Sequence, residues 1–156
     1  MSCSMLNSYF RPTNSTTMDD LISQEHQDKL VPIFVYTRSD AISDGEQMLL
    51  TGKLAQICRD VGYKYPMYLT RSVVSLIEAG IAVSNCVSWE GIVHDLAWMS
   101  LKAKVEWEVD YVKFNCYMIT ADVPEEGELM EFYVQVGATD IDDPEPCLTM
   151  MTPGDR

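Results

Sequence analysis

Residues 104–118 read KVEWEVDYVKFNCYM, and apolar side chains alternate with polar ones along most of this stretch. A period of two is typical of a β-strand that has one face on a hydrophobic core. The alternation changes phase after Asp110, because Tyr111 and Val112 are both apolar. An extra residue in a strand moves all later side chains to the other face, so we predict a β-bulge at residues 110–112.

Two further runs follow toward the C-terminus. After a hairpin-type loop at residues 120–128, which contains proline and glycine, apolar side chains alternate with polar ones over residues 130–136. An acidic loop at residues 140–146 then precedes a short apolar run at residues 147–151. Consecutive strands joined by short loops pair antiparallel, so we predict an antiparallel β-meander in the C-terminal third.

The chain before residue 104 shows helical spacing instead. Thr51, Thr70 and Ser88 each precede apolar residues spaced by three or four positions, and Ser and Thr are favoured N-caps. Gly62 and Gly80 follow the first two of these patterns, so we predict that the helices end there. Helices followed by strands predict an α+β fold, with N-terminal helices packed on a C-terminal antiparallel β-meander.

The N-terminal segment differs from the rest. Residues 1–17 are rich in Ser, Thr and Asn without periodicity, and a short helix is expected to begin at Asp19. Residues 33–36 form a β-branched and aromatic run that is typical of a strand, and an Asp-Gly turn signal follows it. We therefore predict a flexible arm with a short helix at residues 1–32 and a single α+β domain at residues 33–156.

Charge excludes some classes of partner. The chain has a formal net charge of -13, and residues 104–156 hold 13 carboxylates against Lys104, Lys113 and Arg156. Such a surface repels phosphate groups, so we expect a partner with a basic surface and no direct binding of nucleic acid or of a membrane. No signal peptide is visible, no apolar stretch approaches the roughly 20 residues that span a bilayer, and the five cysteines are scattered. These features predict a cytoplasmic protein with reduced thiols.

Residues that could support catalysis or hold a metal are sparse. The two histidines, His26 and His94, are far apart in the sequence. No nucleophile motif surrounds any serine or cysteine, and no Gly-rich phosphate loop is present. The sequence therefore predicts a non-enzymatic protein with no cofactor, no metal site and no catalytic residues.

The first candidate site is acidic. On the strand predicted from residue 104, Glu106, Glu108 and Asp110 would share one face at a spacing of about 6.6–6.8 Å, which coarsely imitates a row of DNA phosphates. We expect this face to bind the basic, nucleic-acid-binding surface of a partner protein. The alternative is a solvated strand face whose charge keeps the protein soluble and protects a sheet edge. Five more carboxylates complete the predicted partner-binding set: Glu131, Asp140, Asp142, Asp143 and Glu145.

The second candidate site is built mainly from tyrosine and arginine, which are enriched in binding hot spots. It consists of Tyr36, Arg38, Asp44, Tyr65 and Arg71. These residues could line a pocket for a small molecule. The alternative is a structural role, in which a salt bridge between Arg38 and Asp44 ties one turn to the next.

Three segments carry a resemblance to known proteins. Residues 35–45 read VYTRSDAISDG, residues 62–71 read GYKYPMYLTR, and residues 148–153 read LTMMTP. Together they resemble a family of small uncharacterised proteins from phages, plasmids and integrative elements, whose members read Tyr-(Ser/Thr)-Arg-x-x-Ala-x-x-Asp-Gly and later Gly-x-x-Tyr-Pro-x-x-Leu-Thr. The chain departs from that family at residues 45–47, where members more often continue with apolar residues. The resemblance covers residues 35–155, and it implies a mobile-element origin but no activity.

Small acidic proteins of mobile elements are often inhibitors of host defence, such as anti-CRISPR or anti-restriction proteins. By this analogy, the leading hypothesis is a non-enzymatic inhibitor of a host-defence nucleoprotein in the bacterial cytoplasm. One alternative is a protein that binds or sequesters a small molecule such as a nucleotide signal. Another is a structural or accessory phage protein whose main contact is itself. The sequence leaves the oligomeric state open.

Overall fold

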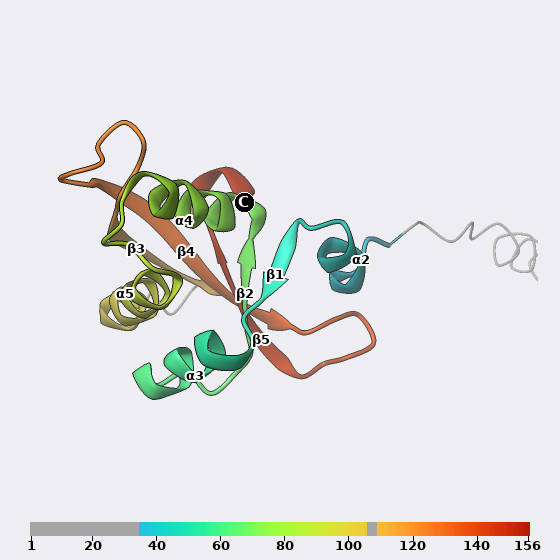
Figure 1. Ribbon diagram of the computed structural model, residues 1–156. Coiled ribbons are helices and arrows are strands. Elements are labelled where there is room, and N and C mark those ends of the chain that lie inside the picture. The colour runs from blue at the N-terminus through green and yellow to red at the C-terminus, as the bar shows by residue number, and fades with distance from the viewer. Residues whose placement is uncertain (1–34, 106–108) are drawn as a thin grey trace, which may run out of the picture. The chain divides into compact units, whose positions relative to one another are not determined.

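A five-stranded sheet lies at the centre of the fold in the computed structural model, which describes residues 35–105 and 109–156 (Figure 1). The strand order is β1-β2-β5-β4-β3. The strands are β1 (Gln47–Leu49), β2 (Met67–Thr70), β3 (Tyr111–Met118), β4 (Glu128–Ala138) and β5 (Pro146–Met151). Neighbouring strands are antiparallel except β2 and β5, which are parallel. The predicted meander is therefore β3-β4-β5, and two strands from the N-terminal half extend it.

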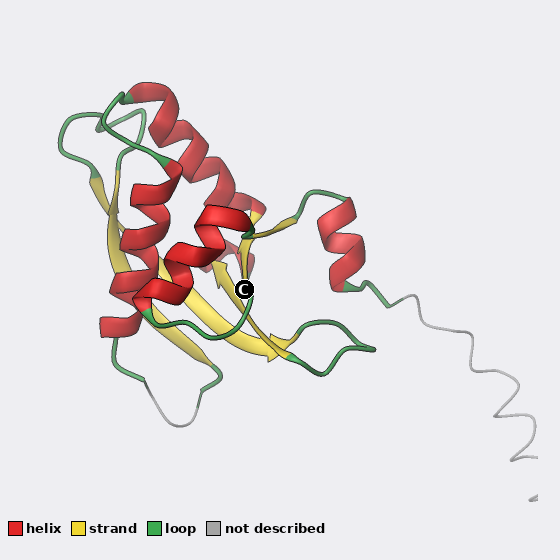
Figure 2. Ribbon diagram, turned by 60° about the horizontal axis from the view of Figure 1, so that its bottom comes forward, coloured by secondary structure: helices red, strands yellow, loops and turns green. Residues whose placement is uncertain are grey.

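Helices precede the C-terminal strands, as predicted. They are α2 (Arg38–Ser43), α3 (Gly52–Val61), α4 (Arg71–Val83) and α5 (Trp89–Lys102), and a short 3₁₀ turn, η1 (Pro153–Asp155), follows β5. Figure 2 shows the three longer helices on one side of the sheet. Residues 36–156 form one compact unit. The α+β fold class is confirmed.

The starts of the three longer helices agree with the prediction. Thr51, Thr70 and Ser88 are the N-caps of α3, α4 and α5, each with an extended backbone. The Ser88 hydroxyl accepts a hydrogen bond from the Gly91 N–H at 3.2 Å, which satisfies one backbone donor of the first turn. The C-cap of α3 is Gly62, whose φ of 130° is unfavourable for other residues.

The predicted end of α4 at Gly80 is wrong, because the helix continues to Val83. Gly80 is a buried helical residue that faces the start of the β3–β4 loop. A Cβ at this position would lie 2.7 Å from the Ile119 carbonyl oxygen. The glycine therefore permits close packing of helix against loop, which is a different use of glycine from ending a helix.

Two expectations around the ends of strands also differ from the structure. Within the predicted strand at residues 33–36, the described residues Val35 and Tyr36 are in no regular element, and the chain then enters α2. Sequence reasoning missed α2, although Thr37 and Asp40 form a capping box that marks its start. The Asp44-Gly45 turn is present.

The predicted β-bulge at residues 110–112 is not formed. β3 begins at Tyr111 and pairs with β4 one residue to one residue, from Tyr111 opposite Gln135 to Met118 opposite Glu128. Asp110 lies in a bend before the strand. The change of hydrophobic phase therefore marks the beginning of the strand. Residues 106–108, which belonged to the same predicted strand, lie outside the described residues, as does the helix predicted in the N-terminal arm.

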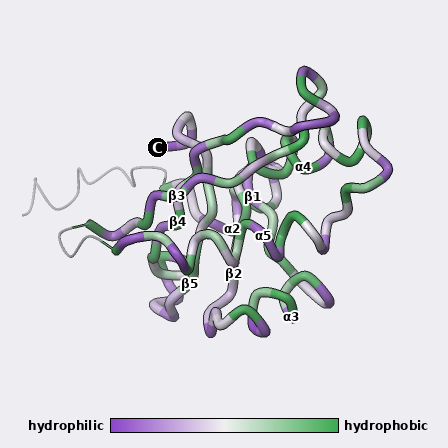
Figure 3. The backbone as a smooth tube through the Cα atoms, turned by 90° about the vertical axis from the view of Figure 1, so that its left-hand side faces the viewer, coloured by the Kyte–Doolittle hydropathy of each residue, from purple (hydrophilic) through white to green (hydrophobic). Residues whose placement is uncertain are grey.

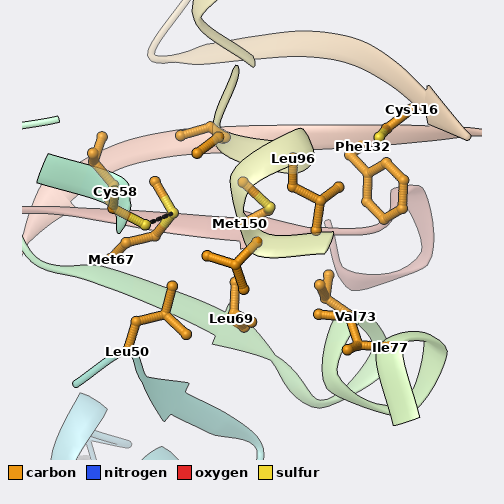
Figure 4. Close-up of a cluster of buried hydrophobic side chains, with 14 of the residues drawn as sticks. Leu50, Cys58, Met67, Leu69, Val73, Ile77, Leu96, Cys116, Phe132 and Met150 are labelled. Atoms are coloured by element: carbon orange, nitrogen blue, oxygen red, sulfur yellow. Dashed lines mark hydrogen bonds between the residues drawn. The ribbon is translucent and has the colours of Figure 1, made fainter. Parts of the chain in front are cut away.

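The hydrophobic core fills the space between the sheet and the three longer helices. Phe132 of β4, Ile77 of α4 and Leu96 of α5 are almost completely buried there (Figure 4). The Cys58 thiol of α3 lies 3.9 Å from the Met67 sulfur of β2 in the same cluster. Hydrophobic and hydrophilic residues are interleaved along the helices and strands (Figure 3), as expected for elements with one buried face. The other face of the sheet carries mostly polar and aromatic side chains.

Candidate functional site

The sheet face opposite the helices carries one candidate residue, Glu131, and a second candidate, Arg38, lines a pocket on it. Strand residues that alternate with the core positions point to this face. They include two tyrosines of the meander, Tyr111 and Tyr133, whose rings are 5.4 Å apart in an edge-to-face arrangement. Further members include Gln47, Tyr68, Thr70, Lys113, Glu131, Gln135, Thr149 and Met151. We call this surface the open face.

Of the acidic row predicted at Glu106, Glu108 and Asp110, only Asp110 lies within the described residues. Its carboxylate is exposed and accepts a hydrogen bond from the Gln135 amide at 2.7 Å. Its carbonyl oxygen accepts from the Val136 N–H at 3.1 Å. Asp110 is thereby attached beside the C-terminal half of β4.

Glu131 lies on the open face, but its charge is compensated there. The Lys113 ammonium on β3 contacts its carboxylate at 2.6 Å, and the Tyr133 hydroxyl donates to it at 2.6 Å. The hydrogen bond from Lys113, followed by that from Tyr133, lowers the pKa of Glu131. The pair is partly exposed, so the ion pair contributes little stability. Glu131 therefore offers less negative charge to a partner than the sequence suggests.

Asp140 acts as a cap for a distant helix. Its carboxylate accepts hydrogen bonds from the backbone N–H groups of Arg38 at 3.3 Å and Ser39 at 3.1 Å, at the start of α2. It also accepts from the Ile141 N–H at 2.8 Å, and this backbone hydrogen bond is the main reason that the pKa of Asp140 is lowered. A structural role accounts for this residue.

Asp142, Asp143 and Glu145 lie in the loop between β4 and β5, which we call the acidic loop (residues 139–145). Asp143 accepts a hydrogen bond from the Glu145 N–H at 3.1 Å. Both the N–H and the hydroxyl of Thr139 donate to the Glu145 carbonyl oxygen at 2.8 Å. Among the described residues, no lysine or arginine forms an ion pair with these three carboxylates. The loop is thus held in shape by its own hydrogen bonds while its charges stay uncompensated.

A second acidic loop lies between β3 and β4 and was not among the predicted site residues. Asp122, Glu125 and Glu126 are exposed there, next to Glu128 at the start of β4. β4 spans 11 residues, so the two acidic loops are separated by roughly 35 Å along it. The sequence composition contained the signal for this cluster, because it contributes to the charge excess of the last third.

Arg38 links four separate parts of the chain. Its Nε donates to the Thr139 carbonyl oxygen at 2.7 Å, and its Nη1 donates to the Thr149 hydroxyl at 3.0 Å and to the Gln47 side-chain oxygen. Its guanidinium carbon lies 4.5 Å from the centre of the Tyr68 ring. The salt bridge to Asp44 that was considered as an alternative is not formed, and Asp44 accepts a hydrogen bond from the Tyr36 hydroxyl at 3.1 Å. The structural role considered for Arg38 is present, with other partners.

The remaining members of the second candidate set do not share a pocket with Arg38. The Arg71 side chain donates to the Gly45 carbonyl oxygen at 3.3 Å, beside the turn after α2. Tyr65 precedes the other end of β2, where it lines a pocket of about 260 Å³ together with Leu49. Arg38 lines a different pocket of about 440 Å³ on the open face. Tyr36, Asp44 and Arg71 therefore lie around the turn after α2, whereas Arg38 and Tyr65 line two different pockets.

Groups with catalytic or metal-binding chemistry are not gathered in the described part of the chain. No cluster of three or more His, Cys, Asp or Glu side chains is present among the described residues. His94 contacts the carboxylate of its neighbour Asp95 at 3.2 Å and stacks on Trp98. Burial, with a smaller contribution from the charge of Asp95, raises the pKa of the Cys116 thiol to about 11, which makes it a poor nucleophile at neutral pH.

Two further observations concern the chain as a whole. Within residues 35–105 and 109–156, no helix has the length and apolar character needed to cross a membrane. Comparisons with protein-family models, curated proteins and solved structures found no match to this chain.

Proposed function

We propose that this protein is a non-enzymatic inhibitor of a host-defence nucleoprotein, and that it binds a basic, nucleic-acid-binding surface of its target through the acidic loop. The observation that carries the proposal is that Asp142, Asp143 and Glu145 form no ion pair with any lysine or arginine in the described part of the chain. Asp110 adds a fourth carboxylate near the same end of β4, where the neighbouring Val136 binds its carbonyl oxygen. The resemblance to mobile-element proteins supplies the class of target by analogy.

Electrostatics favours this kind of contact. Carboxylates without an internal partner lose no ion pair when they meet lysine or arginine, and hydrogen bonds between ionised groups are stronger than neutral ones. The net charge of -13 would also speed the encounter with a basic surface, with a rate that falls as salt rises. The internal hydrogen bonds of the acidic loop reduce the entropy lost when it binds.

A phage-plating assay tests this function. The chain would be expressed in bacteria that carry an active CRISPR or restriction system, and infection by a targeted phage would be scored by plaque number. We expect the wild-type chain to restore plaques. The triple variant Asp142→Asn, Asp143→Asn and Glu145→Gln should lose this protection, because it removes the charges that face the target.

The second acidic loop offers a matched control. The variant Asp122→Asn, Glu125→Gln and Glu126→Gln changes the net charge by the same amount at the opposite end of β4, and it should protect as well as the wild type. Equal loss of protection in the two triple variants would show that only total charge matters. Full protection by the acidic-loop variant would contradict the proposed contact.

A further inference from the structure

The open face contains a polar pocket with a different character from the acidic loops. Its volume is about 440 Å³, within the range of about 300–1,000 Å³ that is common for small-molecule sites. Arg38 from α2 and Arg156 from the C-terminal end both line it, together with side chains of four strands. The strand residues are Gln47, Thr70, Gln135, Thr149 and Met151.

Within the described part of the chain the two guanidinium groups are not paired with carboxylates, although the charge of Arg38 helps to lower the pKa of nearby Asp140. Neither Arg38 nor Arg156 forms an ion pair with a carboxylate among the described residues. This is unexpected in a chain with 24 acidic and 11 basic residues, where carboxylate partners are abundant. Arg156 lies instead over two aromatic rings, with its guanidinium carbon 3.8 Å from the Tyr111 centroid and 4.9 Å from that of Tyr133. These rings orient the cation without neutralising it.

Donors that no described residue uses remain available around the pocket. Arg38 uses Nε and Nη1 to hold Thr139, Thr149 and Gln47, but its Nη2 donates no hydrogen bond to a described residue. The Gln47 oxygen accepts from Arg38, and the amide nitrogen of Gln47 likewise donates to none of them. A structural role for Arg38 explains the hydrogen bonds of Nε and Nη1 but assigns no partner to Nη2.

The pocket also contains one carboxylate, Asp155, which is already well satisfied. It accepts hydrogen bonds from the hydroxyls of Thr70 at 2.7 Å and Ser72 at 2.6 Å, and from the N–H and hydroxyl of Thr152. The lining therefore holds two guanidinium groups against one carboxylate that has four donors of its own. The balance favours an incoming oxyanion.

We propose that this pocket binds the phosphate group of a small phosphorylated molecule, held between Arg38 and Arg156. The flat guanidinium fork matches the oxygens of phosphate, and neutral donors such as the Gln47 amide can complete the shell. The volume leaves room for the group that carries the phosphate, next to the apolar Met151 side chain. The pocket lining includes no carboxylate of the acidic loop, although Arg38 also binds the Thr139 carbonyl oxygen at the start of that loop. Separate variants of the loop and of the pocket therefore test the two proposals.

Calorimetric titration of the full chain with inorganic phosphate, AMP and citrate, at constant ionic strength, tests the site. We expect one-to-one binding of phosphate and AMP in the millimolar range or tighter, with AMP the tighter ligand and citrate weaker than either. Arg156→Gln should weaken binding by about tenfold or more, since it removes a charged donor from an exposed terminal residue. Lys102→Gln is the matched control: its ammonium lies over Trp98 at 4.4 Å, outside the pocket.

Two further variants separate this site from other sources of affinity. Arg38→Lys keeps the charge and loses the fork, so it should also weaken binding, whereas the acidic-loop triple variant should bind phosphate as well as or better than the wild type. Three results would overturn the assignment. These are no saturable heat with phosphate or AMP at about 10 mM, equal affinity of Arg156→Gln and Lys102→Gln, and citrate binding as tight as phosphate.

Discussion

Replacement of Gly80 by alanine gives a sharp test of how α4 packs against the β3–β4 loop. Alanine in a helix interior normally stabilises a protein relative to glycine by about 0.5–1 kcal/mol. At Gly80, however, the new Cβ would lie 2.7 Å from the Ile119 carbonyl oxygen, which is a backbone atom. Such overpacking costs about 1–3 kcal/mol. The clash exceeds the helical gain, so Gly80→Ala should lower the free energy of unfolding by about 1–2 kcal/mol.

Gly91 in α5 provides the matched control. A Cβ there would meet the Ser88 hydroxyl at 3.4 Å, an ordinary contact with a small side chain. Gly91→Ala should therefore be neutral or stabilising by about 0.5 kcal/mol, since it lies in the first turn, where helix propensity has a reduced effect.

Urea unfolding followed by circular dichroism measures both variants. With a slope of about 1–3 kcal/mol per molar urea, the midpoint of Gly80→Ala should fall by roughly 1 M while that of Gly91→Ala stays or rises. Stabilisation of the protein by Gly80→Ala, equal to that by Gly91→Ala, would refute the close approach of α4 to the β3–β4 loop.

Three other predictions follow from side chains on or near the sheet. Arg38→Gln should lower the free energy of unfolding by about 2–3 kcal/mol, because it leaves the buried Thr149 hydroxyl without its hydrogen-bond donor. The control Arg71→Gln loses one exposed hydrogen bond and should change the free energy of unfolding by less than about 0.5 kcal/mol in the same urea assay. Partial burial raises the pKa of Asp155, but the hydrogen bonds from Ser72, Thr70 and Thr152 outweigh burial and lower it overall, so this carboxylate stabilises the fold above its unfolded pKa. Asp155→Asn should lower the free energy of unfolding by about 1 kcal/mol at pH 7. The urea midpoints of the variant and of the wild type should converge as the pH falls below about 4. A constant difference between the two midpoints at all pH values would argue against an ionised Asp155. Iodoacetamide at pH 8 should modify exposed Cys86 long before Cys116, whose pKa of about 11 leaves about 0.1% thiolate. Equal rates of modification of the two cysteines, measured by peptide mass spectrometry, would contradict the burial of Cys116.

Local signals made much of this fold predictable. The helices α3, α4 and α5 have Ser or Thr caps and apolar residues at helical spacing, and both features lie within one segment of chain. The alternation in β4 likewise places Met130, Phe132 and Val134 on the core side of the sheet. Such signals need no knowledge of what lies elsewhere in the protein.

Non-local pairing was not predictable in the same way. All four residues of β2 are buried, so this strand shows no alternation, and β1 has only three residues. The parallel pair places Met67 opposite Leu148, at the far end of the sequence. No short-range pattern encodes that contact, because it depends on the crossover through α4, α5 and the meander.

The candidate sites likewise combine features that were visible in the sequence with contacts that only the fold creates. The excess of carboxylates was visible in the composition, but the compensation of Glu131 by Lys113 depends on the pairing of β3 with β4. The use of Asp140 as a cap for α2 joins residues about 100 positions apart. Arg38 was singled out from the sequence, yet its meeting with Arg156 required the folded sheet.

Competition with DNA tests the central claim most directly. The host protein that co-purifies with the chain would be bound to the labelled chain, and duplex DNA would be titrated into the complex while fluorescence anisotropy is recorded. If the acidic loop occupies a basic nucleic-acid-binding surface, DNA should release the wild-type chain, and higher salt should weaken the complex further. A chain that stays bound while the DNA joins a ternary complex would contradict the account.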